Sequence, residues 1–396
     1  MKLRQWWRDP VNRNYLYSFF KNFAFFSAVL VPFFTDWGHI TLFQVQLLQS
    51  WFSVWVFILE VPTGVVADKI GRKHSLTLGA IFLAVATMLY GSIPVFTNFL
   101  LAEFLFAIGD ALNSGADQAL LYDTLKAQNR EDEGKKVLGY ADALMLAGMA
   151  VAALVGSVIA AKLGLNMPQI LTAIPMLIAG VIAWSIPEPR IHTEQESKRY
   201  IDIFKEGLHL LRRHPVVRAL ALDSTFVAAA AYFVVWFYQP YMESLHIPVI
   251  YFGIAQAGML MIEMLVSANF THLEKILGKE KAYLKSTAFL VMITFVIAAL
   301  FHNLVSLVLF IVIGGGLGFT RATYVVGLIS KHIPSHSRAT VLSSISMLRR
   351  LALVPLNPVM GAVATYSLPL ALASVSILPL GALLTKESVP VKIKAS

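Results

Sequence analysis

Gly64-Val65-Val66-Ala67-Asp68-Lys69-Ile70-Gly71-Arg72-Lys73 is a short charged stretch between two long apolar segments, residues 41–67 and 74–93. Each segment is long enough to cross a bilayer, which takes about 20 residues. Because backbone groups inside a membrane must be satisfied within a helix, we predict two membrane-crossing helices joined by a polar reversal at the surface. Gly71 would permit a backbone conformation that residues with a Cβ avoid. Gly64 would let a neighbouring helix come close.

The composition of the whole chain agrees with this interpretation. Of its 396 residues, 57% are hydrophobic and only 14% are charged. The apolar residues gather in runs of about twenty, as a bilayer requires. We therefore predict an all-α membrane protein with twelve spans, over residues 14–34, 41–67, 74–93, 98–122, 137–161, 168–186, 216–238, 248–272, 282–301, 304–329, 339–360 and 367–384.

Positive charge is distributed unevenly between the two sides of this membrane. The net charge is +9, yet Lys and Arg are not gathered in one domain, so we expect no nucleic acid partner. With the amino terminus inside, the outer segments hold only Lys162. Lys21, Arg321, Arg349 and Arg350 fall within spans, and all other basic residues lie in inner segments. The positive-inside rule, by which basic residues gather on the cytoplasmic side, therefore predicts a multi-pass protein of the cell (inner) membrane, with both termini and the charged stretch in the cytoplasm.

The sequence lacks the motifs of several kinds of chemistry. There is no cysteine, which excludes disulfides and cysteine-ligated metals. The ten histidines include no pair at metal-binding spacing, so we expect no metal and no cofactor. No phosphate-binding glycine loop and no pairing of a nucleophile with a base stands out, so we expect neither direct ATP drive nor an enzyme.

The charged stretch resembles the signature loop between the second and third helices of the major facilitator superfamily. That loop has a glycine, three variable residues, an aspartate, a basic residue, one variable residue, a glycine and two basic residues. The positions that match are Gly64, Asp68, Lys69, Gly71, Arg72 and Lys73. The stretch also follows the second apolar segment, as the family's loop does. The fifth span departs from drug/proton antiporters of this family, because it lacks their glycine-proline pair.

The resemblance implies two pseudo-symmetric bundles of six helices each, and a secondary transporter that moves a small organic solute by alternating access. It also implies that Asp68 and Arg72 belong to a latch between the bundles, closed when the cavity opens outward. The long polar connection agrees with a division into residues 1–187, a cytoplasmic linker at 188–215 and residues 216–396. Within the linker, residues 200–213 have the periodicity of an amphipathic helix.

The fourth span carries the densest set of candidate polar residues. Glu103, Asp110 and Asp117 are seven residues apart, with Asn113 on the same side, and would form one stripe along a continuous helix. Charges within hydrocarbon are costly unless they face a wet cavity or a partner. We interpret the stripe as a cavity wall with a proton site, placed at Asp110 near mid-depth. The alternative is that neighbouring helices satisfy these carboxylates, with Asp117 serving an inner gate.

Four further embedded residues are candidates for the substrate or proton pathway. Lys21 in the first span could pair with a carboxylate of the fourth span, bind a substrate anion or extend to the inner surface. Arg350 shares a helix face with polar residues and would face the cavity. Arg349, on another face of the same helix, would pair with Glu263. Arg321 would form an ion pair of the inner gate.

These residues favour proton-coupled export of amphipathic or drug-like compounds, because embedded carboxylates suit a proton relay. Uptake or exchange of an organic anion is the alternative, because Lys21, Arg321 and Arg350 suit a carboxylate or phosphate. A non-transporting membrane receptor or assembly protein is a third hypothesis. The expected partners are a small-molecule substrate, the lipid bilayer and protons, and we expect a monomer.

Overall fold

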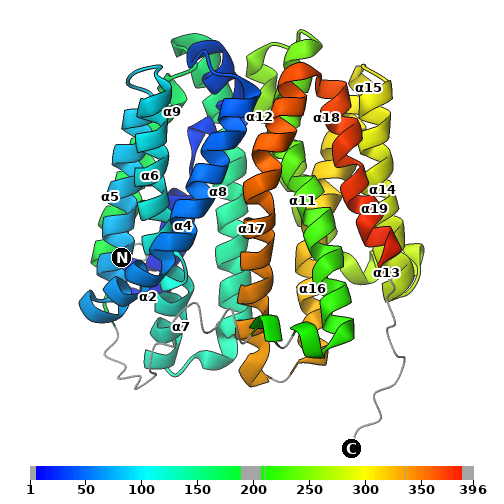
Figure 1. Cartoon of the computed structure of the whole chain (residues 1–396). Coiled ribbons are helices and arrows are strands. Elements are labelled where there is room, and N and C mark those ends of the chain that lie inside the picture. The colour runs from blue at the N-terminus through cyan, green and yellow to red at the C-terminus, as the bar shows by residue number, and fades with distance from the viewer. Residues whose placement is uncertain (1–5, 189–206, 210, 334, 386–396) are drawn as a thin grey trace, which may run out of the picture. The chain divides into compact units, whose positions relative to one another are not determined.

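The computed structural model describes residues 6–188, 207–209, 211–333 and 335–385, which form helices joined by short turns (Figure 1). No strand occurs in these ranges. Ten helical segments of the described part are long and apolar enough to cross a membrane. The predicted spans at 339–360 and 367–384 correspond to a further long helix and a pair of short helices. The prediction of an all-α membrane protein is thus confirmed.

Contacts within the chain divide it into two units. Unit 1 comprises Met1–Ser197 with Ile247–Leu260, and unit 2 comprises Lys198–His246 with Met261–Ser396. The predicted division at residues 187 and 215 stays a prediction. The amphipathic helix predicted at 200–213 lies largely outside the described residues.

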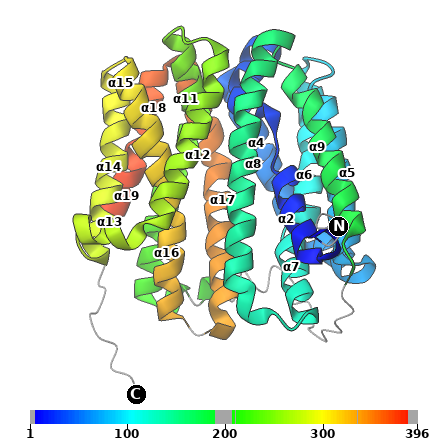
Figure 2. The ribbon, with the colours of Figure 1, turned by 180° about the vertical axis from the view of Figure 1, so that it is seen from behind.

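Unit 1 holds the first six predicted spans. Its elements are α2 (Pro10–Lys21), η1 (Phe25–Val29), α3 (Leu30–Pro32), η2 (Phe33–Trp37), α4 (Leu42–Ile70), α5 (Arg72–Tyr90), α6 (Phe96–Asn113), α7 (Ala116–Ala127), η3 (Glu131–Glu133), α8 (Gly134–Leu163), α9 (Met167–Ser185), η4 (Val249–Tyr251) and the first part of α12 (Phe252–Ala268). Side chains fix where two of the helices begin. Asp9 accepts a hydrogen bond from the Val11 N–H and Thr41 one from the Gln44 N–H, which satisfies donors that have no partner within the helix. Helix α5 packs against both α6 and α9, and the three helices lie together in Figures 1 and 2.

The fourth span is not the single helix that was predicted. α6 ends at Asn113, and α7 begins at Ala116. Gly115 between them has φ +73°, a left-handed conformation that ends a helix. The heptad register of the carboxylates therefore does not continue from Asp110 to Asp117, and the predicted stripe is interrupted.

Close helix contacts in unit 1 depend on glycines within the bundle. A Cβ at Gly79 of α5 would lie 2.9 Å from the carbonyl oxygen of Gly109 on α6. Gly156 of α8 likewise leaves no room for a Cβ beside the Phe25 carbonyl. At Gly64, by contrast, nothing in the described structure lies within 4 Å of an added Cβ. Gly64 is exposed, and the helix contact predicted there is absent from the described residues.

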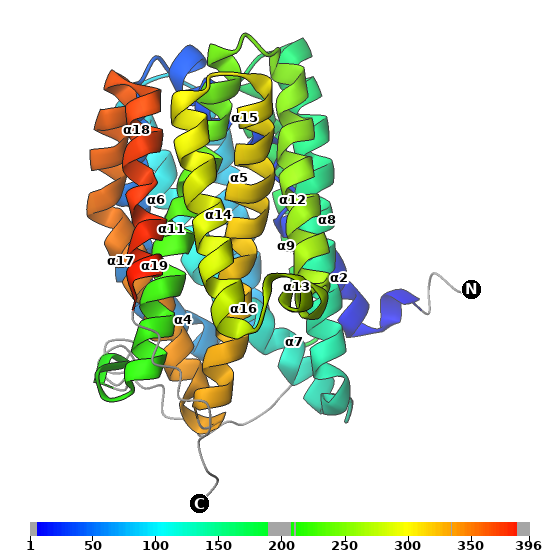
Figure 3. The same cartoon turned by 90° about the vertical axis from the view of Figure 1, so that its right-hand side faces the viewer.

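Unit 2 is built around one buried cluster of aliphatic and tyrosine side chains. Its elements are α11 (Pro215–Ser244), the rest of α12, α13 (Phe270–Leu277), α14 (Glu280–Leu300), α15 (Leu304–Leu309), η5 (Phe310–Leu317), α16 (Gly318–His332), α17 (Ser335–Tyr366), α18 (Leu368–Val375) and α19 (Ile377–Leu384). The cluster includes Leu220, Tyr283, Tyr324 and Leu328. The rings of Tyr283 and Tyr324 lie 4.3 Å apart between centroids. Figure 3 shows α14 and α16 in this unit, with α13 beside their lower ends.

Candidate functional site

The charged stretch forms the end of α4, a turn at Gly71 and the start of α5. Gly71 has φ +100°, which confirms the physical reason for a glycine at this position. The Glu188 carboxylate accepts hydrogen bonds from the backbone N–H groups of Arg72 at 2.7 Å and Lys73 at 2.9 Å. These donors at the start of a helix have no intrahelical partner, and the helix dipole favours a negative charge there. Glu188 therefore anchors the turn within unit 1.

The basic side chains of the charged stretch have different surroundings. The Arg72 guanidinium pairs with the Asp123 carboxylate on α7. Lys73 Nζ lies 5.4 Å from the ring centroid of Trp184. Lys69 is exposed. Arg72 and Lys73 therefore contact α7 and α9 of the same unit.

Asp68 differs from Arg72 and Lys73 because it is exposed near the carboxyl end of α4. Within the described ranges its carboxylate forms no ion pair. A negative charge near the carboxyl end of a helix is unfavourable to that helix. The contribution of Asp68 to the stability of α4 is therefore at best small.

Lys21 pairs with a carboxylate of the fourth span, the first of its three predicted alternatives. Its Nζ lies 3.0 Å from Asp117 Oδ2 and 6.0 Å from the ring centroid of Tyr17. The pair lines a cavity of about 100 Å³, together with Asp142 of α8. The charge of Asp117 is thus balanced within unit 1.

Asn113 does not line a cavity with the carboxylates. Its side chain is fully buried and accepts a hydrogen bond from the Tyr17 hydroxyl. Its own amide donates to the carbonyl oxygen of Gly109 at 2.7 Å. A Cβ at Gly79 would lie 2.6 Å from that amide nitrogen. Asn113 is therefore part of the packing between α2, α5 and α6.

Asp110 differs from Glu103 and Asp117 because, among the described residues, neither an ion pair nor a side-chain hydrogen bond reaches its carboxylate. Its side chain is half-buried and lies near enough to Tyr17 to interact electrostatically with the hydroxyl. Among the described residues it forms no ion pair, because Lys21 is engaged by Asp117. Asp110 is therefore a charge that a proton could neutralise.

Glu103 lies at the wall of a second cavity of about 100 Å³ in unit 1. Its carboxylate accepts a hydrogen bond from Gln49 Nε2 at 3.0 Å and another from the Tyr90 hydroxyl, and its side chain is 5% exposed. The remaining wall is almost entirely aromatic and apolar, with Phe26, Leu30, Phe34, Phe52, Phe106 and Gln169. The site therefore combines one acidic group with ring faces, which attract cations.

Arg321 forms the predicted ion pair, but within unit 2. Its Nη2 lies 2.5 Å from Asp223 Oδ1, and its Nε lies 3.0 Å from Asp223 Oδ2. Its Nη1 also donates to the Leu284 carbonyl and the Thr287 hydroxyl. The guanidinium thus joins α16, α11 and α14 of one unit. The predicted place of Arg321 in an inner gate stays a prediction.

The charged residues of α17 and α12 are not paired as predicted. Arg349 and Arg350 are half-buried on α17, and Glu263 is half-buried on α12. In the described part of unit 2 no ion pair joins Glu263 to Arg349. The described residues therefore leave two adjacent guanidinium groups on α17 without a carboxylate partner.

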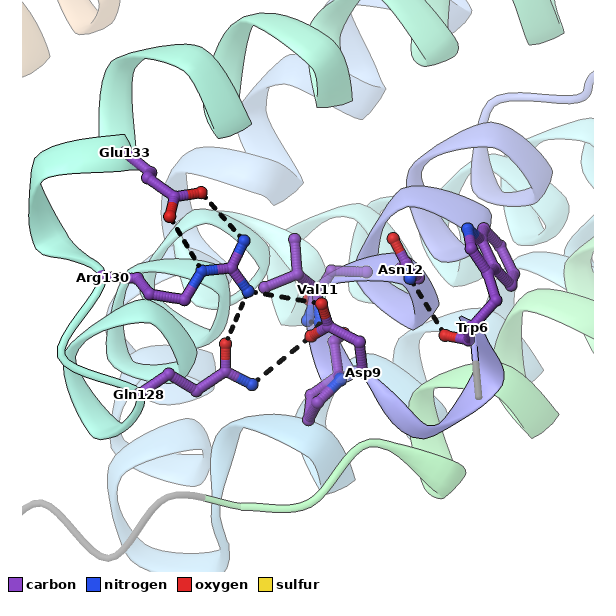
Figure 4. A network of polar contacts seen from close by, with 9 residues as sticks. Trp6, Asp9, Val11, Asn12, Gln128, Arg130 and Glu133 are labelled. Atoms are coloured by element: carbon purple, nitrogen blue, oxygen red, sulfur yellow. Dashed lines mark hydrogen bonds and ion pairs between the residues drawn. The ribbon is translucent and has the colours of Figure 1, made fainter. Parts of the chain in front are cut away.

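A polar network at the start of α2 connects it to the turn between α7 and α8 (Figure 4). Arg130 donates to Glu133 at 2.8 and 3.1 Å, to Gln128 at 2.9 Å and to Asp9 at 3.3 Å. The hydrogen bonds to Glu133 raise the pKa of Arg130, so its charge is permanent. Such exposed pairs stabilise a protein little, and the network mainly fixes the position of the Asp9 cap.

Three acidic residues were not among the predicted site residues: Asp223 and Glu188, which have defined contacts, and Asp142, which lines a cavity. Asp223 and Asp142 are each the sole acid of a predicted span, a signal that could have identified them. Glu188 follows Pro187 directly after the sixth span, where no sequence pattern indicates that it caps α5. The contacts of Asp223 and Glu188 join segments far apart in the sequence.

Comparisons with known proteins agree on one family. A family model described as Major Facilitator Superfamily matches residues 14–355. An uncharacterized MFS-type transporter of Methanocaldococcus jannaschii is 20% identical over 180 residues, which are 46% of this chain and 45% of that protein. The chain thus spans about half the length of this curated relative.

Two solved structures have a similar fold. A mutant of the nucleoside transporter NupG superposes with a TM-score of 0.78 at 14% identity, covering 95% of this chain and 98% of NupG. A bacterial homologue of the human lysosomal transporter Spinster, in an inward-facing and unoccupied conformation, superposes with a TM-score of 0.72 at 16% identity. The match covers 95% of this chain and 93% of the homologue. At these identities the likeness concerns the fold alone.

Proposed function

The chain belongs to the Major Facilitator Superfamily, and on that premise we propose that it is a secondary transporter of a small organic solute. We propose export of an amphipathic compound in exchange for protons, by alternating access between the two bundles. The observation that carries this proposal is the aromatic cavity with the buried Glu103 carboxylate. A buried carboxylate is costly unless a positive charge neutralises it, so this cavity favours a cationic group, and we propose that the exchanged proton binds at Asp110.

The size of this cavity limits what it can hold. A volume of about 100 Å³ accommodates a small head group, whereas sites for drug-sized ligands measure roughly 300 Å³ or more. We therefore propose that unit 1 supplies a subsite for the cationic end of an amphipathic substrate. Phe26, Phe52 and Phe106 would contact the apolar part nearest to the charge.

Exchange or uptake of an organic anion is the second candidate function. The observation that favours it is the pair Arg349 and Arg350 on α17, for which the described residues provide no carboxylate. Guanidinium groups bind carboxylates and phosphates in bidentate geometry.

A thermal-shift screen of the purified protein distinguishes the two candidates. A ligand of the folded state raises the unfolding temperature in proportion to its occupancy. We expect stabilisation by cationic amphiphiles that strengthens as the pH rises and is lost in Glu103→Gln. Stabilisation by organic anions that is lost in Arg350→Ala would instead make anion transport the better account.

Asp68→Asn is expected to reduce transport while leaving folding nearly unchanged. As the family's signature loop implies, we propose that Asp68 belongs to a latch between the bundles, present in one conformation only. Its exposure means that its removal leaves no buried group unsatisfied. Each 1.4 kcal/mol taken from one state of a two-state latch shifts the equilibrium about tenfold, so we expect a reduction of this order. The measurement is substrate flux in proteoliposomes at matched protein content.

Asp132→Asn provides the control for this variant, because Asp132 is also exposed and lies in η3, outside the charged stretch. Flux at the level of the unmodified protein in Asp68→Asn would remove the latch proposal. A lowered unfolding temperature in that variant alone would indicate a structural role instead.

A further inference from the structure

Unit 2 contains a cavity of about 780 Å³ beside α13, which none of the predicted pathway residues lines. Leu220 of α11, Leu284 of α14 and Leu328 of α16 form its apolar wall. The rest of the lining is Thr271, Glu274, Lys275, Gly278, Lys279, Glu280, Lys281 and His332. These three leucines are at most 5% exposed and belong to the buried cluster of unit 2. The cavity is therefore a pocket with an apolar interior that opens beside a polar turn.

Around this pocket the acidic side chains have hydrogen-bond or ion-pair partners, whereas the lysines that line it do not. Its two carboxylates both have partners: Glu274 accepts a hydrogen bond from the Tyr324 hydroxyl, and Glu280 pairs with Lys331 at 2.8 Å. Its lysines are Lys275, Lys279 and Lys281, all exposed. Within the described residues none of the three forms an ion pair or a side-chain hydrogen bond. The hydroxyl leaves the negative charge of Glu274 in place. Among the described residues the rim therefore has three unpaired lysines against one unpaired carboxylate, and its net charge is positive.

The helix α13 carries Lys275 at the edge of an apolar surface, while Lys279 lies in the following turn and Lys281 in the first turn of α14. Phe270, Leu273 and Leu277 pack against the buried cluster, whereas Ile276 is 66% exposed. The helix lies beside the lower end of α14 (Figure 3). A short helix with one apolar side and basic residues beside it is typical of the membrane interface.

We propose that this pocket binds an anionic phospholipid, with the phosphate at Lys275, Lys279 and Lys281 and an acyl chain along the leucine wall. A free phosphate or a small polar anion would make no use of the apolar interior. A zwitterionic lipid would fill the interior but gain little from three lysines, because its head group carries no net charge. The positive-inside pattern predicts the segment with these lysines to be cytoplasmic, the side whose leaflet is rich in anionic lipids.

The test measures unfolding temperature in nanodiscs of phosphatidylcholine that contain increasing fractions of phosphatidylglycerol. We expect a saturable rise with the phosphatidylglycerol fraction, since a lipid bound only by the folded state stabilises it. In the triple variant Lys275→Gln, Lys279→Gln and Lys281→Gln, we expect the affinity for phosphatidylglycerol to fall about fivefold for each lysine removed. These side chains are exposed, so the variant should fold.

The matched control removes three lysines of unit 1 that lie in a predicted inner segment, through Lys126→Gln, Lys135→Gln and Lys136→Gln. It has the same net charge as the triple variant, and we expect it to keep the saturable rise. An equal loss in both variants would overturn the proposal in favour of unspecific attraction to a charged surface. An equal rise with soluble glycerol phosphate would also overturn it, because the ligand would then be a free phosphate compound.

Discussion

Arg321→Ala is expected to destabilise the protein by about 3–5 kcal/mol, because it leaves a buried carboxylate without its counter-charge. Arg321 and Asp223 are 2% and 1% exposed, and two hydrogen bonds of 2.5 and 3.0 Å join them. The substitution also frees the Leu284 carbonyl and the Thr287 hydroxyl, which the guanidinium contacts. The measurement is the unfolding temperature of the purified variant in detergent, with the yield of monodisperse protein as a second readout.

The control for this prediction replaces both partners, through Arg321→Met with Asp223→Leu. Replacing a buried ion pair by apolar side chains of similar volume is often neutral, because the cost of desolvating two charges disappears. We expect the double variant to recover most of the lost stability. If Arg321→Ala alone unfolds at the temperature of the unmodified protein, the pair does not hold α11, α14 and α16 together.

Asp110→Asn is expected to abolish the dependence of transport on a pH gradient while exchange of substrate down its own gradient continues. The reason lies in the surroundings of three carboxylates. Lys21 neutralises Asp117, and Gln49 and Tyr90 hydrogen-bond Glu103. Asp110 has no such partner among the described residues, so binding a proton there changes the net charge of the site. The asparagine keeps the shape of the side chain but cannot release a proton.

Glu103→Gln is the comparison variant for proton coupling. We expect it to weaken the binding of a cationic substrate and to leave the response to a pH gradient in place. The two variants therefore separate a substrate subsite from a proton site. If Asp110→Asn responds to a pH gradient as the unmodified protein does, the proton site lies elsewhere, and Asp142 beside Lys21 becomes the next candidate.

Much of the fold could be predicted because the bilayer imposes a length on every span. Runs of about twenty apolar residues located the ten segments of the described part that are long and apolar enough to cross a membrane, and the charged stretch located the turn at Gly71. The break at Gly115 was missed, because an apolar run was interpreted as one continuous helix. A glycine directly after Asn113 and Ser114 is a turn signal, and it marks the position where the helix ends.

The partners within the site could not be predicted in the same way. Lys21 had three alternatives, and only the packing of α2 against α7 selects Asp117. Arg321 was predicted to pair, yet its partner lies 98 residues away on α11. Helical periodicity tells which residues of one helix share a face, but not which helix that face meets. The same limit explains why Asn113, on the predicted stripe, lies in the packing between helices.

The central claim is that protons drive the transport of an amphipathic cation, and flux in proteoliposomes tests it most directly. An inside-acidic pH gradient is imposed, and uptake of a labelled amphipathic cation is followed with and without an ionophore that collapses the gradient. The account predicts accumulation above the external concentration, lost with the ionophore and in Asp110→Asn. Uptake by the unmodified protein that only equalises the two concentrations, whatever the gradient, would contradict it.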